Sequence, residues 1–347
     1  MGLQKVHQGA HFGRYVFARW VHGVESLHFK ESITVPPVET MNPIFVCLSP
    51  DSKPIQYKPC TALLAPGNAN PITKACMQSA TQTPVFFISH GAPTFALEPG
   101  KLGPQLQALG AQLAGVRAVL VVSPHWQTRG MAVSTTAAPE TIYDFGGFPA
   151  ALYELEYPAA GAPQIAEQTA KLLTEAGYAI SLDTRRGLDH GAWVPLFHLL
   201  PDAKIPVFQV SMPYDLNAEQ AVQLGRALAP LRAQDVLIVA SGSMTHNLGE
   251  FRRGVAAGDN YVQEFSNWVR TAVLANAVQP VIRYRSEAPH AERAHPTEEH
   301  FLPLLVALGA QMEGDDVQLI DGGIEHGMLS MDSFVWGMTQ TLSSALH

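Results

Sequence analysis

The sequence predicts a single α/β domain with a central, mostly parallel or mixed sheet and helices on both faces. From Thr83 onward, short apolar segments typical of strands alternate with segments whose apolar residues recur at helical spacing. This alternation continues to Val335 with no internal repeat. The chain also holds 28 Gly and 26 Pro, which favours a loop-rich enzyme over a helical bundle.

The predicted strands are apolar runs that mostly end at Gly, Pro or Ser. They cover residues 85–89, 118–123, 130–136, 178–182, 206–211, 235–240, 317–320 and 328–335. The predicted helices cover 101–113, 163–176, a segment after Leu188 that ends near Leu200, 217–231 and 260–275. A last helix is predicted from Pro296, because proline suits a first helical position and Glu298 and Glu299 would then occupy the first turn.

Residues 1–80 differ in pattern from residues 81–347. They combine scattered His and Arg with Pro36-Pro37 and the Pro/Asn-rich stretch 65–71, and neither helical nor alternating periodicity persists. We therefore expect residues 1–80 to be a disordered or extraneous N-terminal extension. The catalytic domain is expected to span 81–347, with Met77 as a candidate natural start.

Composition excludes several classes of partner. The formal net charge of -8 argues against nucleic acid or an anionic membrane as the main partner. No apolar run approaches the roughly 20 residues that span a bilayer, and no secretory signal is evident, so a cytoplasmic protein is predicted. All three cysteines (Cys47, Cys60, Cys76) precede Met77, which excludes a cysteine-rich zinc site. The oligomeric state is left open.

Histidines follow several of the predicted strands. Three apolar runs lead into Ser-containing turns with His90, His125 and His246 just beyond, while His190 and His300 lie beside helix starts. One histidine in such a place is more often structural than functional. Because the carboxyl ends of strands meet at one edge of an open sheet, the set together predicts a site there. Neutral imidazole binds both zinc and iron.

Nucleophilic hydrolysis is the main competing chemistry suggested by the residues alone. Ser89 and Ser123 precede histidines, but the chain has no Gly-x-Ser-x-Gly elbow. It also has no Gly-x-Gly-x-x-Gly motif and no phosphate-binding Lys loop. A metal site built from histidines is the better interpretation.

Six motifs then carry a family resemblance. In chain order they are Ser89-His-Gly91, Ser123-Pro-His-Trp126, Thr141-Ile-Tyr-Asp-Phe-Gly-Gly-Phe-Pro149, Leu188-Asp-His-Gly-Ala-Trp193, Ala240-Ser-Gly-Ser-Met-Thr-His-Asn-Leu248 and Pro296-Thr-Glu-Glu-His-Phe-Leu-Pro303. Each motif alone is weak, but the ordered set is specific. It resembles the class III extradiol ring-cleavage dioxygenases, in the branch typified by 4,5-DOPA dioxygenase, over residues 84–336.

The resemblance implies a site with one divalent metal, Zn(2+) or Fe(2+). It implies His90, His125 and His300 as metal ligands, with His246 as a fourth ligand in zinc-containing members or an acid/base in iron-containing ones. His190 would be a substrate-facing proton donor or acceptor. Related ring-cleaving enzymes use two histidines and a carboxylate, so a histidine at position 300 leaves the native metal open.

The resemblance also implies a reaction. A catechol-type, DOPA-like diol would bind the metal through its hydroxyl oxygens, and O2 would be inserted beside the diol to give a ring-opened semialdehyde. Zinc has no redox chemistry and does not activate O2 in this way. Tyr143, Phe145 and Phe148 would wall the ring site, with core packing as an equal alternative, whereas Trp126 and Trp193 are expected in the core.

Two other functions fit the same sequence. One is a non-catalytic binding protein on this fold, although all five histidines are present. The other is a metal-dependent hydrolase that uses a metal-bound water.

Overall fold

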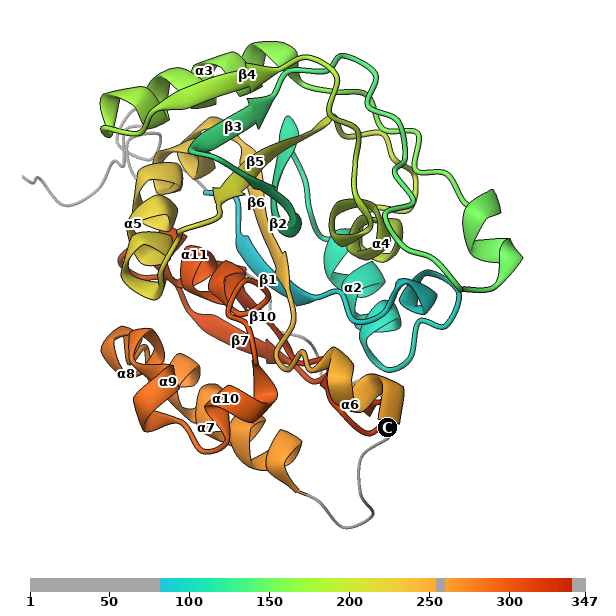
Figure 1. Cartoon of the computed structure of the whole chain (residues 1–347). Helices are drawn as coiled ribbons and strands as arrows, with labels where there is room; N and C mark the ends of the chain where they lie inside the picture. The colour runs from blue at the N-terminus through green and yellow to red at the C-terminus, as the bar shows by residue number, and fades with distance from the viewer. Residues whose placement is uncertain (1–81, 254–259, 339–347) are drawn as a thin grey trace, which may run out of the picture. The chain divides into compact units, whose positions relative to one another are not determined.

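The protein is built around an eight-stranded mixed sheet with a separate two-stranded ribbon (Figure 1). The computed structural model describes residues 82–253 and 260–338, so the predicted extension 1–80 lies outside the described residues, as do the three cysteines. The sheet order is β4-β3-β5-β2-β6-β1-β10-β7. Its strands are β1 (Val85–Ser89), β2 (Ala118–Thr128), β3 (Met131–Ser134), β4 (Ile180–Asp183), β5 (Val207–Pro213), β6 (Val236–Gly242), β7 (Val317–Ile320) and β10 (Ser333–Trp336).

The middle of the sheet is parallel and its edges are mixed. β5, β2, β6 and β1 pair in parallel, as do β3 and β4, while β10 pairs antiparallel with both β1 and β7. β1 and β6 are buried along their whole length, as expected for parallel strands covered on both faces. The mixed α/β sheet predicted from the sequence is thereby confirmed.

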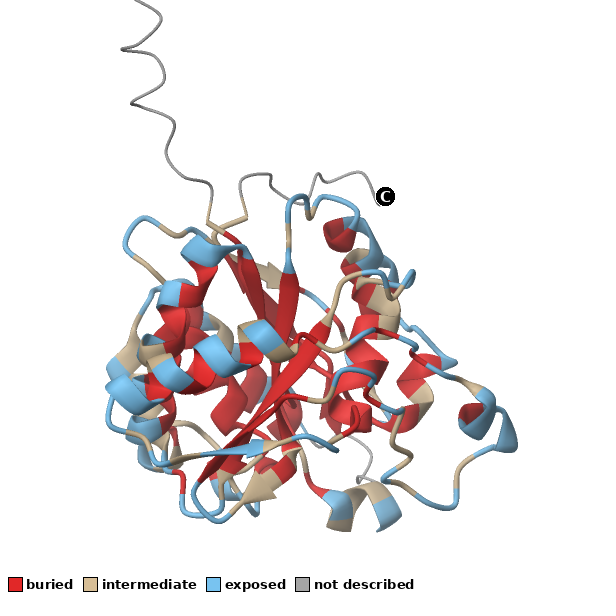
Figure 2. Ribbon diagram, turned by 90° about the horizontal axis from the view of Figure 1, so that it is seen from above, coloured by how far each residue is buried: buried red, intermediate tan, exposed pale blue. Residues whose placement is uncertain are grey.

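Helices cover both faces of the sheet. One layer contains α11 (Leu302–Ala310), which packs on β6, β1 and α5 (Ala218–Leu228), and α3 (Pro163–Glu175), which contacts α5. The opposite layer contains α2 (Leu102–Gly110) against α4 (His190–Leu199), which packs on β2 (Figure 1). Buried residues concentrate in the sheet and on the helix sides that face it (Figure 2).

Smaller elements complete the fold. α7 (Tyr261–Leu274) packs on β7 and on the short α8 (Val278–Ile282). The remaining elements are α6 (Leu248–Arg253), α9 (Tyr284–Glu287), α10 (Ala291–Ala294), the ribbon β8 (Ile324–Glu325) and β9 (Leu329–Ser330), and the 3-10 helices η1 (Pro93–Ala96), η2 (Ala150–Glu154) and η3 (Ala229–Gln234).

The structure corrects two expected strands and adds helices that were not predicted. β2 continues to Thr128 instead of ending at Ser123, and the predicted strand 328–335 divides into β9, which pairs with β8, and β10. The segment 278–294 forms three short helices that were not predicted.

The largest boundary error concerns the last long helix. The prediction that it begins at Pro296 is wrong: α11 begins at Leu302, with Pro303 in its first turn. Pro303 suits that position because its missing N–H is not needed there. Glu298 and Glu299 therefore precede the helix and are not first-turn acids, and His300 also lies in the connecting turn.

Candidate metal centre

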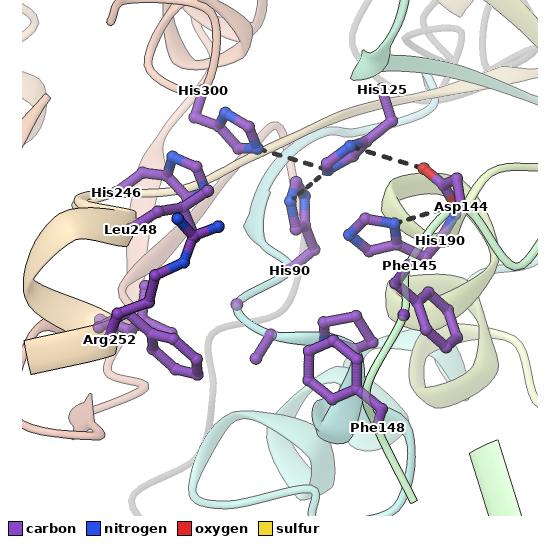
Figure 3. Close-up of a pocket in the computed structure, with 16 residues that line it drawn as sticks. His90, His125, Asp144, Phe145, Phe148, His190, His246, Leu248, Arg252 and His300 are labelled. Atoms are coloured by element: carbon purple, nitrogen blue, oxygen red, sulfur yellow. Dashed lines mark hydrogen bonds and ion pairs between the residues drawn. The ribbon is translucent and has the colours of Figure 1, made fainter. Parts of the chain in front are cut away.

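Five histidines from different elements line one cavity of about 460 Å³ (Figure 3). His90 directly follows β1, His246 lies just beyond β6, and His125 lies within β2. His190 is the first residue of α4, and His300 lies just before α11. Because β2, β6 and β1 are adjacent in the sheet, their carboxyl ends bring these side chains together.

An irregularity in β2 directs His125 into the cavity. Val122 pairs with Val210 and Gln127 with Met212, so residues 123–126 of β2 stand opposite Ser211 alone. The backbone N–H of His125 donates to Ser123 Oγ over 3.2 Å. Gly191, in the first turn of α4, lies so close that a Cβ there would meet His125 Cδ2 at 2.9 Å. This glycine leaves room for the imidazole.

Three imidazole nitrogens converge within the cavity. His125 Nε2 lies 3.2 Å from His90 Nε2 and 3.4 Å from His300 Nε2 (Figure 3). Two nitrogens that bind one ion at about 2.1 Å, with about 100–110° between them, lie about 3.2–3.4 Å apart. The two distances from His125 Nε2 therefore fit a divalent metal bound by His125 together with His90 and His300.

The second nitrogen of each of these rings faces an oxygen. His90 Nδ1 lies 2.9 Å from Ser241 Oγ, and His300 Nδ1 lies 3.1 Å from Glu299 Oε1. His125 Nδ1 lies 3.6 Å from a carboxylate oxygen of Asp144. A proton held on Nδ1 by such a partner leaves the Nε2 lone pair free for a metal.

Burial keeps these imidazoles neutral. Burial, with the neighbouring histidines, holds the pKa of His90 and that of His300 well below 6.5. Burial and His190 lower the pKa of His125 to about 4. The pKa of His246 also falls to about 4, because burial outweighs the opposing effect of Glu299. Neutral imidazole is the form that binds a metal.

The structure brings the histidines together as two neighbouring groups of possible ligands, which the 3.4 Å contact between His125 Nε2 and His300 Nε2 connects. His90, His125 and His190 place ligand atoms within 4.8 Å of one another, and so do His246, Glu299 and His300. The ring of His246 stacks on that of His300 with centroids 3.5 Å apart and an interplanar angle of 9°. All four histidines expected as ligands thus belong to one continuous cluster.

Asp144, which the sequence analysis did not single out, connects two of the histidines. Its Oδ1 lies 3.0 Å from His190 Nδ1 and accepts a 2.9 Å hydrogen bond from the His190 backbone N–H. Burial alone would raise the pKa of Asp144, but the interactions with His190 outweigh it and lower the pKa to about 2. Asp144 is therefore a carboxylate at neutral pH. Its position inside the aromatic, glycine-bearing motif was the available signal.

Asp189 connects the elements around the histidines through hydrogen bonds. It is fully buried and caps α4 by accepting from the Ala192 N–H. It also accepts from Ser123 Oγ at 2.7 Å, and from Arg186 Nη2 and Gln209 Nε2 at 2.8 Å each. One carboxylate thereby joins β2, β5 and the loop before α4. The ion pair with the partly buried Arg186 balances the charge of Asp189.

Aromatic side chains form part of the cavity wall. Phe145 and Phe148 line it, but Tyr143 does not. The Tyr143 hydroxyl instead donates to the Leu155 carbonyl at 2.8 Å. Trp126 and Trp193 are buried, as expected.

A second wall was missed by sequence reasoning. Leu248, Phe251 and Arg252 of α6 line the cavity. The available signal was position, because α6 begins two residues after His246.

A family model described as the catalytic LigB subunit of aromatic ring-opening dioxygenase matches residues 84–328. The chain is 39% identical over 263 residues to a 4,5-DOPA dioxygenase extradiol of Beta vulgaris, covering 73% of this chain and 96% of the relative. It is 37% identical over 266 residues to a protein of the same name from Escherichia coli K12, with coverages of 75% and 97%. A dioxygenase of Hapsidospora irregularis is 32% identical over 279 residues, with coverages of 73% and 85%.

A solved structure also matches the chain. The crystal structure of an uncharacterized Escherichia coli K12 protein matches with a TM-score of 0.60 and 32% identity, covering 73% of this chain and 99% of that one. The chain therefore belongs to the family of the catalytic LigB subunit of aromatic ring-opening dioxygenases, as an extradiol dioxygenase within it.

Proposed function

We propose that the protein is a metal-dependent dioxygenase that inserts O2 into the ring of a catechol and gives a ring-opened semialdehyde. The observation that carries this proposal is the convergence of the Nε2 atoms of His90, His125 and His300 inside an aromatic-walled cavity. Neutral imidazoles whose Nδ1 atoms face oxygen atoms are well suited to a catalytic metal with open positions.

In this proposal His90, His125 and His300 hold one divalent metal, Zn(2+) or Fe(2+). A bound metal lowers the pKa of the diol hydroxyls, and iron additionally supplies the redox chemistry that O2 requires. His246, stacked on His300, lies beside the metal as a fourth ligand or an acid/base. The neutral state of these imidazoles at physiological pH supports both assignments.

We assign to His190 the transfer of the catechol proton. Its Nδ1 faces the Asp144 carboxylate, which favours the tautomer with the proton on Nδ1 and leaves Nε2 to accept one. We assign to Nε2 the removal of a proton from a catechol hydroxyl and its later return to the cleaved product. The negative charge of Asp144 stabilises the imidazolium in between.

Phe145 and Phe148 orient the ring and keep water from the reacting face. Their rings lie edge-to-face, with centroids 5.5 Å apart, and Phe145 also packs against His190 at 5.7 Å. A planar aromatic substrate gains dispersion and edge-to-face contacts from such a wall.

The relatives named 4,5-DOPA dioxygenase extradiol support a DOPA-like substrate for this chain. The cytoplasmic location stays a prediction. No helix among the described residues has the length and apolar character needed to cross a membrane.

The test combines an oxygen electrode with absorbance spectroscopy. Protein stripped of metal and reloaded with Fe(II) should consume O2 with a catechol and form a yellow semialdehyde, and the zinc-loaded protein should not. Labelled O2 should enter the product. No O2 uptake over a panel of catechols, or label arriving from water alone as a metal-dependent hydrolase requires, would contradict the proposal.

A further inference from the structure

One side of the cavity carries a cation that the reaction above does not use. Arg252 belongs to α6 and lines the same cavity as the five histidines (Figure 3). Its side chain is exposed and makes no hydrogen bond or ion pair with any residue in 82–253 or 260–338. Leu248 and Phe251 line the cavity beside it. The guanidinium of Arg252 therefore stands beside apolar side chains, with its N–H groups available to a ligand in the cavity.

The cavity holds one other charged side chain, Asp144, among its described lining residues. Asp144 is already engaged, because it faces His190 Nδ1 at 3.0 Å and His125 Nδ1 at 3.6 Å and accepts from the His190 N–H. The remaining lining residues are histidines, apolar side chains and glycines. The cavity therefore presents an available positive charge and no available negative one.

We propose that Arg252 binds a carboxylate on the substituent of the catechol, so that the preferred substrates are catechols with an anionic side chain. An amino group on that side chain has no counterion in the described cavity and is not required. This inference rests on the proposed function, since it places the diol at the histidines and the substituent toward α6. Arg is suited to the role because its planar fork can donate two parallel hydrogen bonds to one carboxylate.

The neighbouring arginine provides a matched control. Arg253 is exposed, lies on the same short helix and carries the same charge, but does not line the cavity. Long-range attraction of anions by α6 would involve both arginines, whereas a direct contact involves Arg252 alone. The two variants Arg252→Gln and Arg253→Gln therefore separate local binding from general charge.

The test compares three catechols: dihydrocaffeate with a carboxylate, methylcatechol with no charge, and dopamine with an ammonium. The wild type should prefer dihydrocaffeate. Arg252→Gln should raise the KM for dihydrocaffeate about tenfold, as expected for one partly exposed charge-assisted contact, with kcat and the KM for methylcatechol little changed. Arg253→Gln should change neither, and Arg252→Lys should restore part of the loss.

Three outcomes would overturn the inference: equal effects of Arg252→Gln on dihydrocaffeate and methylcatechol, no effect on dihydrocaffeate, or a wild-type preference for dopamine. Anaerobic calorimetry of dihydrocaffeate binding to wild type and Arg252→Gln gives a readout independent of turnover. If no catechol is cleaved by the wild type yet Arg252→Gln still weakens dihydrocaffeate binding, the proposed reaction fails and the anion site stands.

Discussion

The two walls of the cavity are built in opposite ways. The histidine wall is formed by strand ends and the start of α4. It contains the buried side chains of His90, His190 and His300, with the carboxylates of Asp144 and Asp189 beside the cluster. The α6 wall is a helix of six residues with no fully buried side chain, and its Arg252 has no partner in the described chain. A wall of side chains held within the fold can keep catalytic groups in place. An exposed wall can contact the substituents by which substrates differ.

The largest effect is expected from a change in the histidine wall. His90→Ala should abolish metal binding and ring cleavage while leaving the fold intact, because it removes one of three converging nitrogens from the end of a strand. The measurements are metal content and circular dichroism. His290→Asn is the control, since His290 is exposed and sits at a positive φ that Asn accepts. Stoichiometric metal in His90→Ala would show that His90 is not a ligand.

A smaller effect is expected from replacing Asp144, whose carboxylate faces His190 Nδ1. Asp144→Asn should lower kcat about 10- to 100-fold, because the amide keeps the shape but loses the charge that orients His190. Metal content and melting temperature distinguish this from structural damage. Asp202→Asn, which removes only an exposed ion pair with Lys204, should behave as wild type. An unchanged kcat in Asp144→Asn would remove Asp144 from the mechanism.

Phe145 and Tyr143 test the aromatic part of the wall. Phe145→Ala should raise the KM for every catechol about tenfold, because it removes a large apolar surface from the ring site. Tyr143→Phe should leave KM unchanged and lower stability by about 1 kcal/mol, the value of its hydrogen bond to Leu155. A raised KM in Tyr143→Phe would reverse this distinction.

The smallest effect is expected from trimming. A chain that begins at Met77 should keep the metal content and kcat/KM of the full chain, because the family match begins at residue 84 and every cavity residue follows it. Limited proteolysis should leave an active fragment that starts near the same point. Loss of activity on trimming would show that residues 1–76 contribute to function.

The sequence was sufficient to predict the sheet and the histidines because both depend on local signals. An apolar run such as Val85–Ser89 forms a buried strand. Because β1 and β6 are parallel, His90 and His246 lie at the same edge of the sheet. It could not predict Asp144 or Arg252 as site residues, because their roles depend on how loops and α6 fold onto the strand ends. Tyr143 and Phe145 are aromatic residues of one motif, but only Phe145 lines the cavity, and the sequence does not distinguish them.

The irregular part of β2 has a consequence for how insertions and deletions can alter this enzyme. Residues 123–126 stand opposite one residue of β5, so we expect the flanking pairs to tolerate a change of one residue between them. Loss of one residue from this segment would leave the sheet paired and the protein folded, yet it would rotate the His125 side chain away from His90. Chain length at this point, as much as residue identity, decides whether a folded copy of this domain is a catalyst.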